Sequence, residues 1–326
     1  MKHFIRNIAI GVGILIAFIF CWGRFCDWYF AETKYFDDKT NKRAWALKLE
    51  DRKYDYGVLG SSRAYSSFDM VSLNSLLGLK GVNLGANGSG YVDNFLVLYL
   101  FLANGNVIDT LFLQVDIYSL DSKANFSNAF HTYQFLPYWR DSIVANSLYP
   151  YLDAKERLLW EYLPDIRYFK FNKYFSPKEV VRRYQFSKQH VSGFDKTFGG
   201  PPGESFEEGG NKMSADREAK ERSFDDLDVA YLLKIIQLCK ANYIYLVAYK
   251  APELSISLKN TSNYSALQAE IDEMLTQRNV PYIEFNEVSA GDADSFSDPT
   301  HLNSRGREAF TKSFSTEFLR LKSESF

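Results

Sequence analysis

Short apolar runs alternate with helix-length segments in two parts of the chain, and this alternation limits the possible folds most strongly. Strands separated by helices imply right-handed crossovers, and so a parallel sheet between two layers of helices. The sequence therefore predicts a three-layer α/β/α domain. Its expected strands are 56–59, 81–84, 110–115, 243–248 and 282–285, and its expected helices are 64–77, 91–102, 225–240, 263–278 and 307–322.

The alternation stops between about residues 118 and 222. This portion contains aromatic clusters such as Pro137-Tyr138-Trp139 and Tyr168-Phe169-Lys170-Phe171, followed by a glycine-rich acidic loop at 199–210. We interpret it as an insertion of helices and loops. It could be a lid or an acceptor-binding surface at the active edge of the sheet, or equally a structural elaboration or a docking surface for a partner.

The amino terminus carries an uncharged run at residues 7–23. As a helix it would span roughly 26 Å, close to the lower limit for a bilayer core. Lys2 and Arg6 precede it, so the positive-inside rule places the rest of the chain outside the cytoplasm. A cleaved signal peptide is the rival interpretation, but no small-x-small site follows the run. We expect an anchor at 1–30, a juxtamembrane connector at 31–53 and the main domain at 54–326.

Composition excludes several kinds of partner and cofactor. The formal net charge is -2 and the isoelectric point is about 6.2, so the chain lacks the basic surface of a nucleic-acid-binding protein. Its 3 cysteines provide no disulfide framework, and its 4 histidines form no spacing suited to a metal. We therefore predict neither a metal nor another cofactor.

Three residues from opposite ends of the main domain could form a catalytic set. Ser62 follows the first predicted strand, and Asp298 and His301 precede the last predicted helix. A histidine can take the proton of a serine hydroxyl, and a carboxylate can orient the imidazole. All three positions follow strands, so they should meet at the carboxyl edge of the sheet. The alternative is that Asp298 is an ordinary capping aspartate and His301 a surface histidine. Ser61, beside Ser62, would have the structural role of capping the following helix.

Gly60-Ser61-Ser62 after a strand, Val82-Asn83-Leu84-Gly85, and Asp298-x-x-His301 before the last helix resemble blocks of the SGNH (GDSL-type) hydrolase superfamily. The resemblance covers roughly residues 54–120 and 225–322. It implies a flavodoxin-like fold with Ser62 as nucleophile, His301 as base and Asp298 as its partner. The backbone N–H groups of Ser62 and Gly85 would then form the oxyanion hole.

The third block departs from the superfamily pattern. A Gly-x-Asn-Asp sequence should follow the third strand, but this chain has Gln114-Val115-Asp116 there. An ionised aspartate cannot donate a hydrogen bond, so the oxyanion hole would use two donors, or Arg63, Asn83 or Asn87 would supply the third. Asp116 could instead position a sugar hydroxyl, or simply make a structural hydrogen bond.

Within the superfamily, the sequence is most similar to membrane-anchored members that serve O-acylation of the cell envelope, including alginate acetylation and teichoic acid D-alanylation proteins. This resemblance implies a bacterial inner-membrane protein with an extracytoplasmic acyltransferase or esterase domain. It further implies a polysaccharide acceptor for an acyl group, expected to be acetyl, and a multi-span membrane acyltransferase as partner. The alternatives are a non-catalytic glycan-binding or assembly protein with a decayed site, and a simple anchored esterase.

Overall fold

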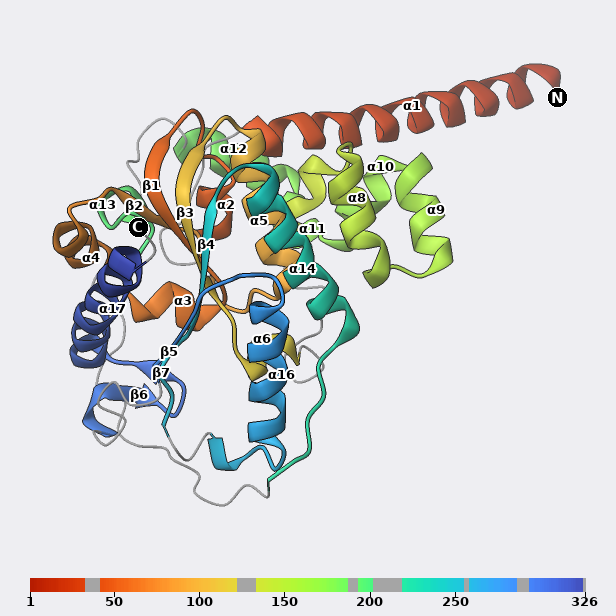
Figure 1. Cartoon of the computed structure of the whole chain (residues 1–326). Coiled ribbons are helices and arrows are strands. Elements are labelled where there is room, and N and C mark those ends of the chain that lie inside the picture. Colours follow the sequence, from red (N-terminus) through yellow and green to blue (C-terminus); the bar gives the residue numbers. More distant parts are fainter. Residues whose placement is uncertain are drawn as a thin grey trace. The chain divides into compact units, whose positions relative to one another are not determined.

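The computed structural model describes residues 1–32, 42–121, 133–186, 193–201, 219–254, 258–285 and 293–324. The chain divides into two compact units. One contains the amino-terminal helix and most of the predicted insertion, and the other contains the sheet (Figure 1). Their bounds are Met1–Tyr35 with Ser127–His190, and Phe36–Phe126 with Val191–Phe326.

A five-stranded sheet forms the centre of the sheet unit. All its neighbouring strands are parallel, and their order is β2-β1-β3-β4-β5. This is the flavodoxin-like order, in which ligands bind near the carboxyl ends of β1 and β3. The predicted α/β class and parallel sheet are confirmed. The strands are β1 (Lys53–Leu59), β2 (Gly81–Asn83), β3 (Val107–Gln114), β4 (Tyr245–Lys250) and β5 (Tyr282–Glu284).

Helices cover both faces of this sheet (Figure 1). On one face, α17 (Ser304–Glu324) buries Phe310, Phe314 and Phe318 in a cluster with Phe112 of β3 and Tyr249 of β4. The helices α3 (Ser62–Ser67) and α4 (Met70–Leu77) pack on the same side. On the other face lie α5 (Tyr91–Ala103), α14 (Asp226–Ala241) and α16 (Tyr264–Thr276).

The prediction of a single helix at 64–77 is wrong, because the chain leaves the helical conformation at Phe68 and begins a second helix at Met70. Asp69 causes the break: its carboxylate accepts hydrogen bonds from the amides of Val71 and Ser72 and so caps α4. The change of axis also alters which side chains face inward. Val71 and Leu76 are exposed, whereas Phe68 and Leu73 are buried.

Part of the expected connector belongs to the sheet unit. Residues 42–49 include the short helix α2 (Lys42–Ala46), and the side chains of Trp45, Ala46, Leu47 and Leu49 are buried. Trp45 donates to Asp195, on α13 (Gly193–Lys196), over 3.0 Å. Another short helix, α6 (Ile117–Leu120), follows β3.

The other unit is built around α1 (Lys2–Glu32), which is long and apolar enough to cross a membrane. Its last turns bury Cys26, Asp27 and Phe30. Short helices pack around these turns, with Trp160 and Tyr168 in their core. They are η2 (Tyr133–Tyr138), α8 (Ser142–Leu148), η3 (Tyr149–Tyr151), α9 (Ala154–Tyr162), α10 (Pro164–Lys170), α11 (Asn172–Phe175) and α12 (Pro177–Phe186).

Candidate active site

Ser62 is the first residue of α3, directly after the sharp turn that follows β1. The turn requires Gly60, which has a φ of 154°. A Cβ atom on this residue would lie 2.6 Å from Gln114 Cβ and 2.7 Å from Ala64 Cβ. The close approach of β1, β3 and α3 therefore places the Ser62 hydroxyl at the carboxyl edge of the sheet.

The imidazole of His301 lies against this hydroxyl. Its Nε2 is 2.8 Å from Ser62 Oγ, and its Nδ1 is 2.8 Å from Asp298 Oδ2. The structure thus brings together all three predicted catalytic residues in one hydrogen-bonded series, although Ser62 and His301 are 239 positions apart. A neutral imidazole in this series can accept the serine proton through one nitrogen while it donates to the carboxylate through the other.

A short hairpin holds the Asp298–His301 pair in place. It consists of β6 (Phe296–Asp298) and β7 (His301–Leu302). Asp298 Oδ1 accepts from the amides of Thr300 and His301 over 2.8 and 3.0 Å, and the Leu254 amide donates to the carbonyl of Pro299 over 2.9 Å. The turn is therefore tied both to itself and to the segment after β4.

Asp298 is held in its ionised form. Partial burial opposes ionisation, but hydrogen bonds from His301 and Thr300 outweigh it and hold the pKa of this carboxyl well below its usual range. A carboxylate of this kind can stabilise the imidazolium that forms when His301 takes a proton.

A cavity of about 220 Å³ opens beside Ser62 and His301. Its lining comes from the start of α3, the loop after β2, the end of β3 with the segment after it, and the hairpin. The lining residues are Ser61, Ser62, Arg63, Gly88, Ser89, Gly90, Gln114, Asp116, Tyr118, Ser119, Thr300 and His301.

The two amides that were predicted to form the oxyanion hole, those of Ser62 and Gly85, have different surroundings in the structure. The Ser62 amide is at the start of α3, where the helix itself offers no acceptor. The Gly85 amide instead donates to Asn83 Oδ1 over 2.9 Å, and Gly85 does not line the cavity. Gly88 does line it, with a φ of 69°, and its amide has no acceptor among the described residues. Gly88 therefore fits the second donor better than Gly85.

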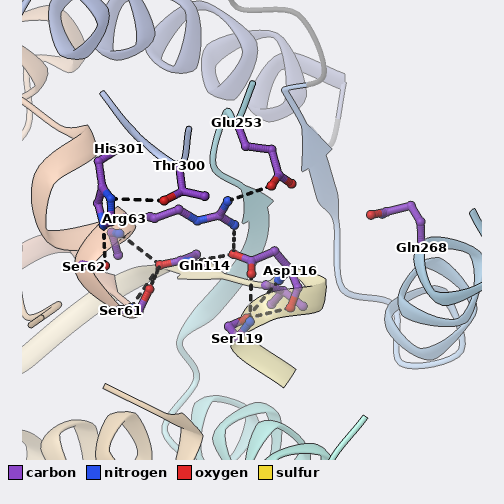
Figure 2. A network of polar contacts seen from close by, with 12 residues as sticks. Ser61, Ser62, Arg63, Gln114, Asp116, Ser119, Glu253, Gln268, Thr300 and His301 are labelled. Atoms are coloured by element: carbon purple, nitrogen blue, oxygen red, sulfur yellow. Dashed lines mark hydrogen bonds and ion pairs between the residues drawn. The ribbon is translucent and has the colours of Figure 1, made fainter. Parts of the chain in front are cut away.

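Gln114 is a site residue that the sequence analysis did not identify. Its Oε1 accepts from the amides of Ser61 and Ala64 and from Ser61 Oγ, each over 3.0 Å, and its Nε2 donates to Asp116 Oδ2 over 2.5 Å (Figure 2). The glutamine side chain, rather than Ser61, therefore caps α3. The sequence signal that could have identified Gln114 is its position at the end of β3, in the third block.

Arg63 and Asp116 form a buried ion pair at the cavity wall, and Glu253 adds a second carboxylate 3.6 Å from Arg63 (Figure 2). Burial opposes ionisation of Asp116, but Arg63 and the hydrogen bond from Gln114 lower its pKa overall. Asp116 also caps α6 by accepting from the Ser119 amide over 2.9 Å. Both residues, which the sequence indicated as possible substrate-binding residues, line the cavity, but they are already engaged with each other.

The two predicted asparagines lie outside the cavity lining. Asn83 is buried and donates to the carbonyl oxygens of Ala64 and Tyr65, and so joins the end of β2 to α3. Asn87 is exposed, next to Gly88. Neither side chain is placed to act as a donor within the cavity.

No protein-family model matches the chain, and no curated protein matches it. Nine chains of solved structures match. One is a Bacteroides fragilis NCTC 9343 crystal structure described as that of a candidate acylhydrolase, which is 8% identical over 88% of this chain and 99% of its own, with a TM-score of 0.38. A likeness of this size carries no argument about the activity of the chain.

Proposed function

We propose that this protein is a membrane-anchored serine acyltransferase or esterase that acts on acyl groups of an extracytoplasmic polysaccharide. The observation that carries the proposal is the hydrogen-bonded series from Ser62 Oγ through His301 to Asp298, which opens onto a cavity. If His301 were only a surface residue and Asp298 only a cap, neither role would require the Ser62 hydroxyl to lie 2.8 Å from His301 Nε2. This arrangement favours an enzyme over a non-catalytic binding protein.

In the first half-reaction, His301 Nε2 takes the proton of Ser62 as Oγ attacks the acyl carbonyl. The amides of Ser62 and Gly88 would donate to the oxyanion, and Asp298 would stabilise the imidazolium. The tetrahedral intermediate then collapses to acyl-Ser62, and His301 gives its proton to the departing alcohol oxygen. In the second half, His301 deprotonates a glycan hydroxyl or water, which attacks acyl-Ser62 and restores the free serine.

The size and lining of the cavity support a short acyl group. A volume of about 220 Å³ suits an acetyl group with part of a sugar ring better than a long fatty acyl chain. The Ser89 hydroxyl accepts a hydrogen bond from Arg43 and keeps its own proton to donate to a sugar hydroxyl. The resemblance to envelope O-acylation proteins supports the same substrate class, with a multi-span acyltransferase as the donor of the acyl group.

Anchoring by α1 is part of the proposal. The helix is long and apolar enough to span a bilayer, and Lys2 and Arg6 at its start favour a cytoplasmic amino terminus. The sheet unit would then face the periplasm or cell surface, where polysaccharides are modified.

The test is the acetyl content of exported polysaccharide in intact cells that express either Ser62→Ala or the matched control Ser61→Ala. We expect Ser62→Ala to abolish the modification, because the nucleophile is lost, and Ser61→Ala to retain most of it, because Gln114 still caps α3. Unchanged acylation with Ser62→Ala in a folded, membrane-located protein would refute the proposal.

A further inference from the structure

Large hydrophobic side chains are exposed unusually often in the described part of the insertion. Outside α1, seven of them lie within residues 133–186, against six in the much longer described part of the sheet unit. Scattered exposed hydrophobics are ordinary, but a concentration of them marks an interaction surface. The seven are Ile143, Leu158, Tyr162, Leu163, Phe169, Val181 and Tyr184.

Three of the seven are close together on α9 and the turn that follows it. Leu158 is 61% exposed and Tyr162 69% exposed, and their spacing of four places them on one face of the helix. Lys155 is exposed and extends this face by one turn, and Leu163 follows directly. The opposite face of α9 already serves the core, because Trp160 is buried against Trp139 with ring centroids 5.2 Å apart.

The contacts of α10 with α1 show where this face lies along the proposed membrane span. The carboxyl of Asp165, in the first turn of α10, lies beside the backbone of Gly23. One turn further along both helices, Arg167 and Tyr168 each donate to the buried Asp27 over 2.5 Å. Thus α10 begins level with the last residue of the uncharged run 7–23, and the end of α9 directly precedes it (Figure 1).

We propose that the face formed by Lys155, Leu158, Tyr162 and Leu163 lies in the headgroup region of the bilayer that α1 spans. The proposal rests on the anchoring role given to α1 above. Tyrosine is typical of this region, because its ring can be buried while its hydroxyl stays hydrated. Leucines at the same depth would reach the acyl boundary, and Lys155 could extend its ammonium group to lipid phosphates.

This second contact would fix the orientation of the helical unit. A single spanning helix leaves its attached domain free to rotate about the helix axis and to tilt. Here the buried hydrogen bonds of Asp27 join α1 to α10, so α9 would follow every rotation of α1. A face of α9 held at the lipid surface would therefore restrict both motions.

The experiment uses the full-length protein without its three cysteines, which are replaced by alanine, reconstituted in nanodiscs of phosphatidylcholine and phosphatidylglycerol. Single cysteines introduced as Tyr162→Cys, Ile14→Cys and Tyr243→Cys carry an environment-sensitive fluorophore. Ile14 is in the middle of the apolar run, and Tyr243 is a 96% exposed tyrosine of the sheet unit. Quenching is measured with nitroxides attached either to the lipid headgroup or deep on the acyl chain.

We expect the label at 162 to be quenched most by the headgroup nitroxide and the label at 14 by the deep nitroxide, with the label at 243 as the reference for an exposed tyrosine outside the helical unit. Quenching at 14 without quenching at 162 would overturn the proposed lipid contact and leave the anchor intact, as expected if a protein partner covered this face. Absence of quenching at both positions would overturn the anchor and the lipid contact together.

Discussion

At the level of single residues, the site depends on backbone amides that the side-chain motifs do not reveal. The sequence analysis chose Gly85 as an oxyanion donor because it follows the second strand. The structure directs the Gly85 amide to Asn83 and places Gly88 at the cavity instead. The two glycines are three residues apart, and the conformation of the turn between β2 and α5 decides which amide reaches the cavity. Residue type and spacing do not encode that conformation.

We predict that Gly88→Ala lowers kcat by roughly 10- to 100-fold, somewhat less than the typical loss on removing a whole oxyanion donor. The residue has a positive φ, so a side chain strains the turn and shifts the amide. Gly78→Ala is the matched control, since Gly78 also has a positive φ of 64° but caps α4 away from the cavity. Both variants should lose about 1 kcal/mol of stability. Equal kcat values for the two would exclude Gly88 from the oxyanion hole.

At the level of secondary-structure elements, Gln114 joins several segments at the carboxyl edge of the sheet. This side chain joins β3 to the start of α3 and to Asp116, and it replaces the capping function expected of Ser61. The alternation of apolar runs and amphipathic segments predicted the five strands of the sheet and the helices α5, α14, α16 and α17. It did not show the break at Phe68 and Asp69, because a local side-chain cap outweighed the helical spacing there.

We predict that Gln114→Leu lowers kcat/KM by roughly 100-fold, because a nucleophile misplaced by about 1 Å costs that much. The variant leaves the amides of Ser61 and Ala64 without their acceptor. Gln268→Leu is the control, since Gln268 lies on α16 away from Ser62 (Figure 2) and binds Tyr282 and Asp272. The assay is hydrolysis of a small acetyl ester alongside thermal unfolding. A similar loss of activity in both variants would show that Gln114 acts only through stability.

Asp165 gives a pH-dependent prediction for the helical unit. Burial raises its pKa from a usual value of 3.8 to about 6, although Gly23 and Arg167 partly oppose the shift. Between these two pKa values, the folded state therefore binds more protons than the unfolded state, and the free energy of unfolding falls as the pH rises. We expect Asp165→Asn to raise the melting temperature in detergent at pH 7.5, with a smaller gain at pH 4. A lower melting temperature at pH 7.5 would contradict this account.

At the level of the whole molecule, distant segments of the chain meet at one edge of the sheet. The alternation of strands and helices predicts a parallel sheet, and both Ser62 and the Asp298–His301 pair follow expected strands, so the sequence led us to expect them at the same edge of the sheet. The division of the chain into two units was harder to predict from the sequence. The packing of the insertion helices on α1 depends on side chains such as Asp27 and Arg167, which carry no periodic signal.

The most direct measurement is labelling of the purified full-length protein with a fluorophosphonate, followed by mass spectrometry of the modified peptide. The account predicts a single adduct on Ser62, which is lost in His301→Ala and kept in Ser61→Ala. Removal of His301 should slow labelling by about 10⁴-fold or more, because the serine then lacks its base. An adduct on Ser61, or labelling of Ser62 that does not depend on His301, would contradict the proposed catalytic site.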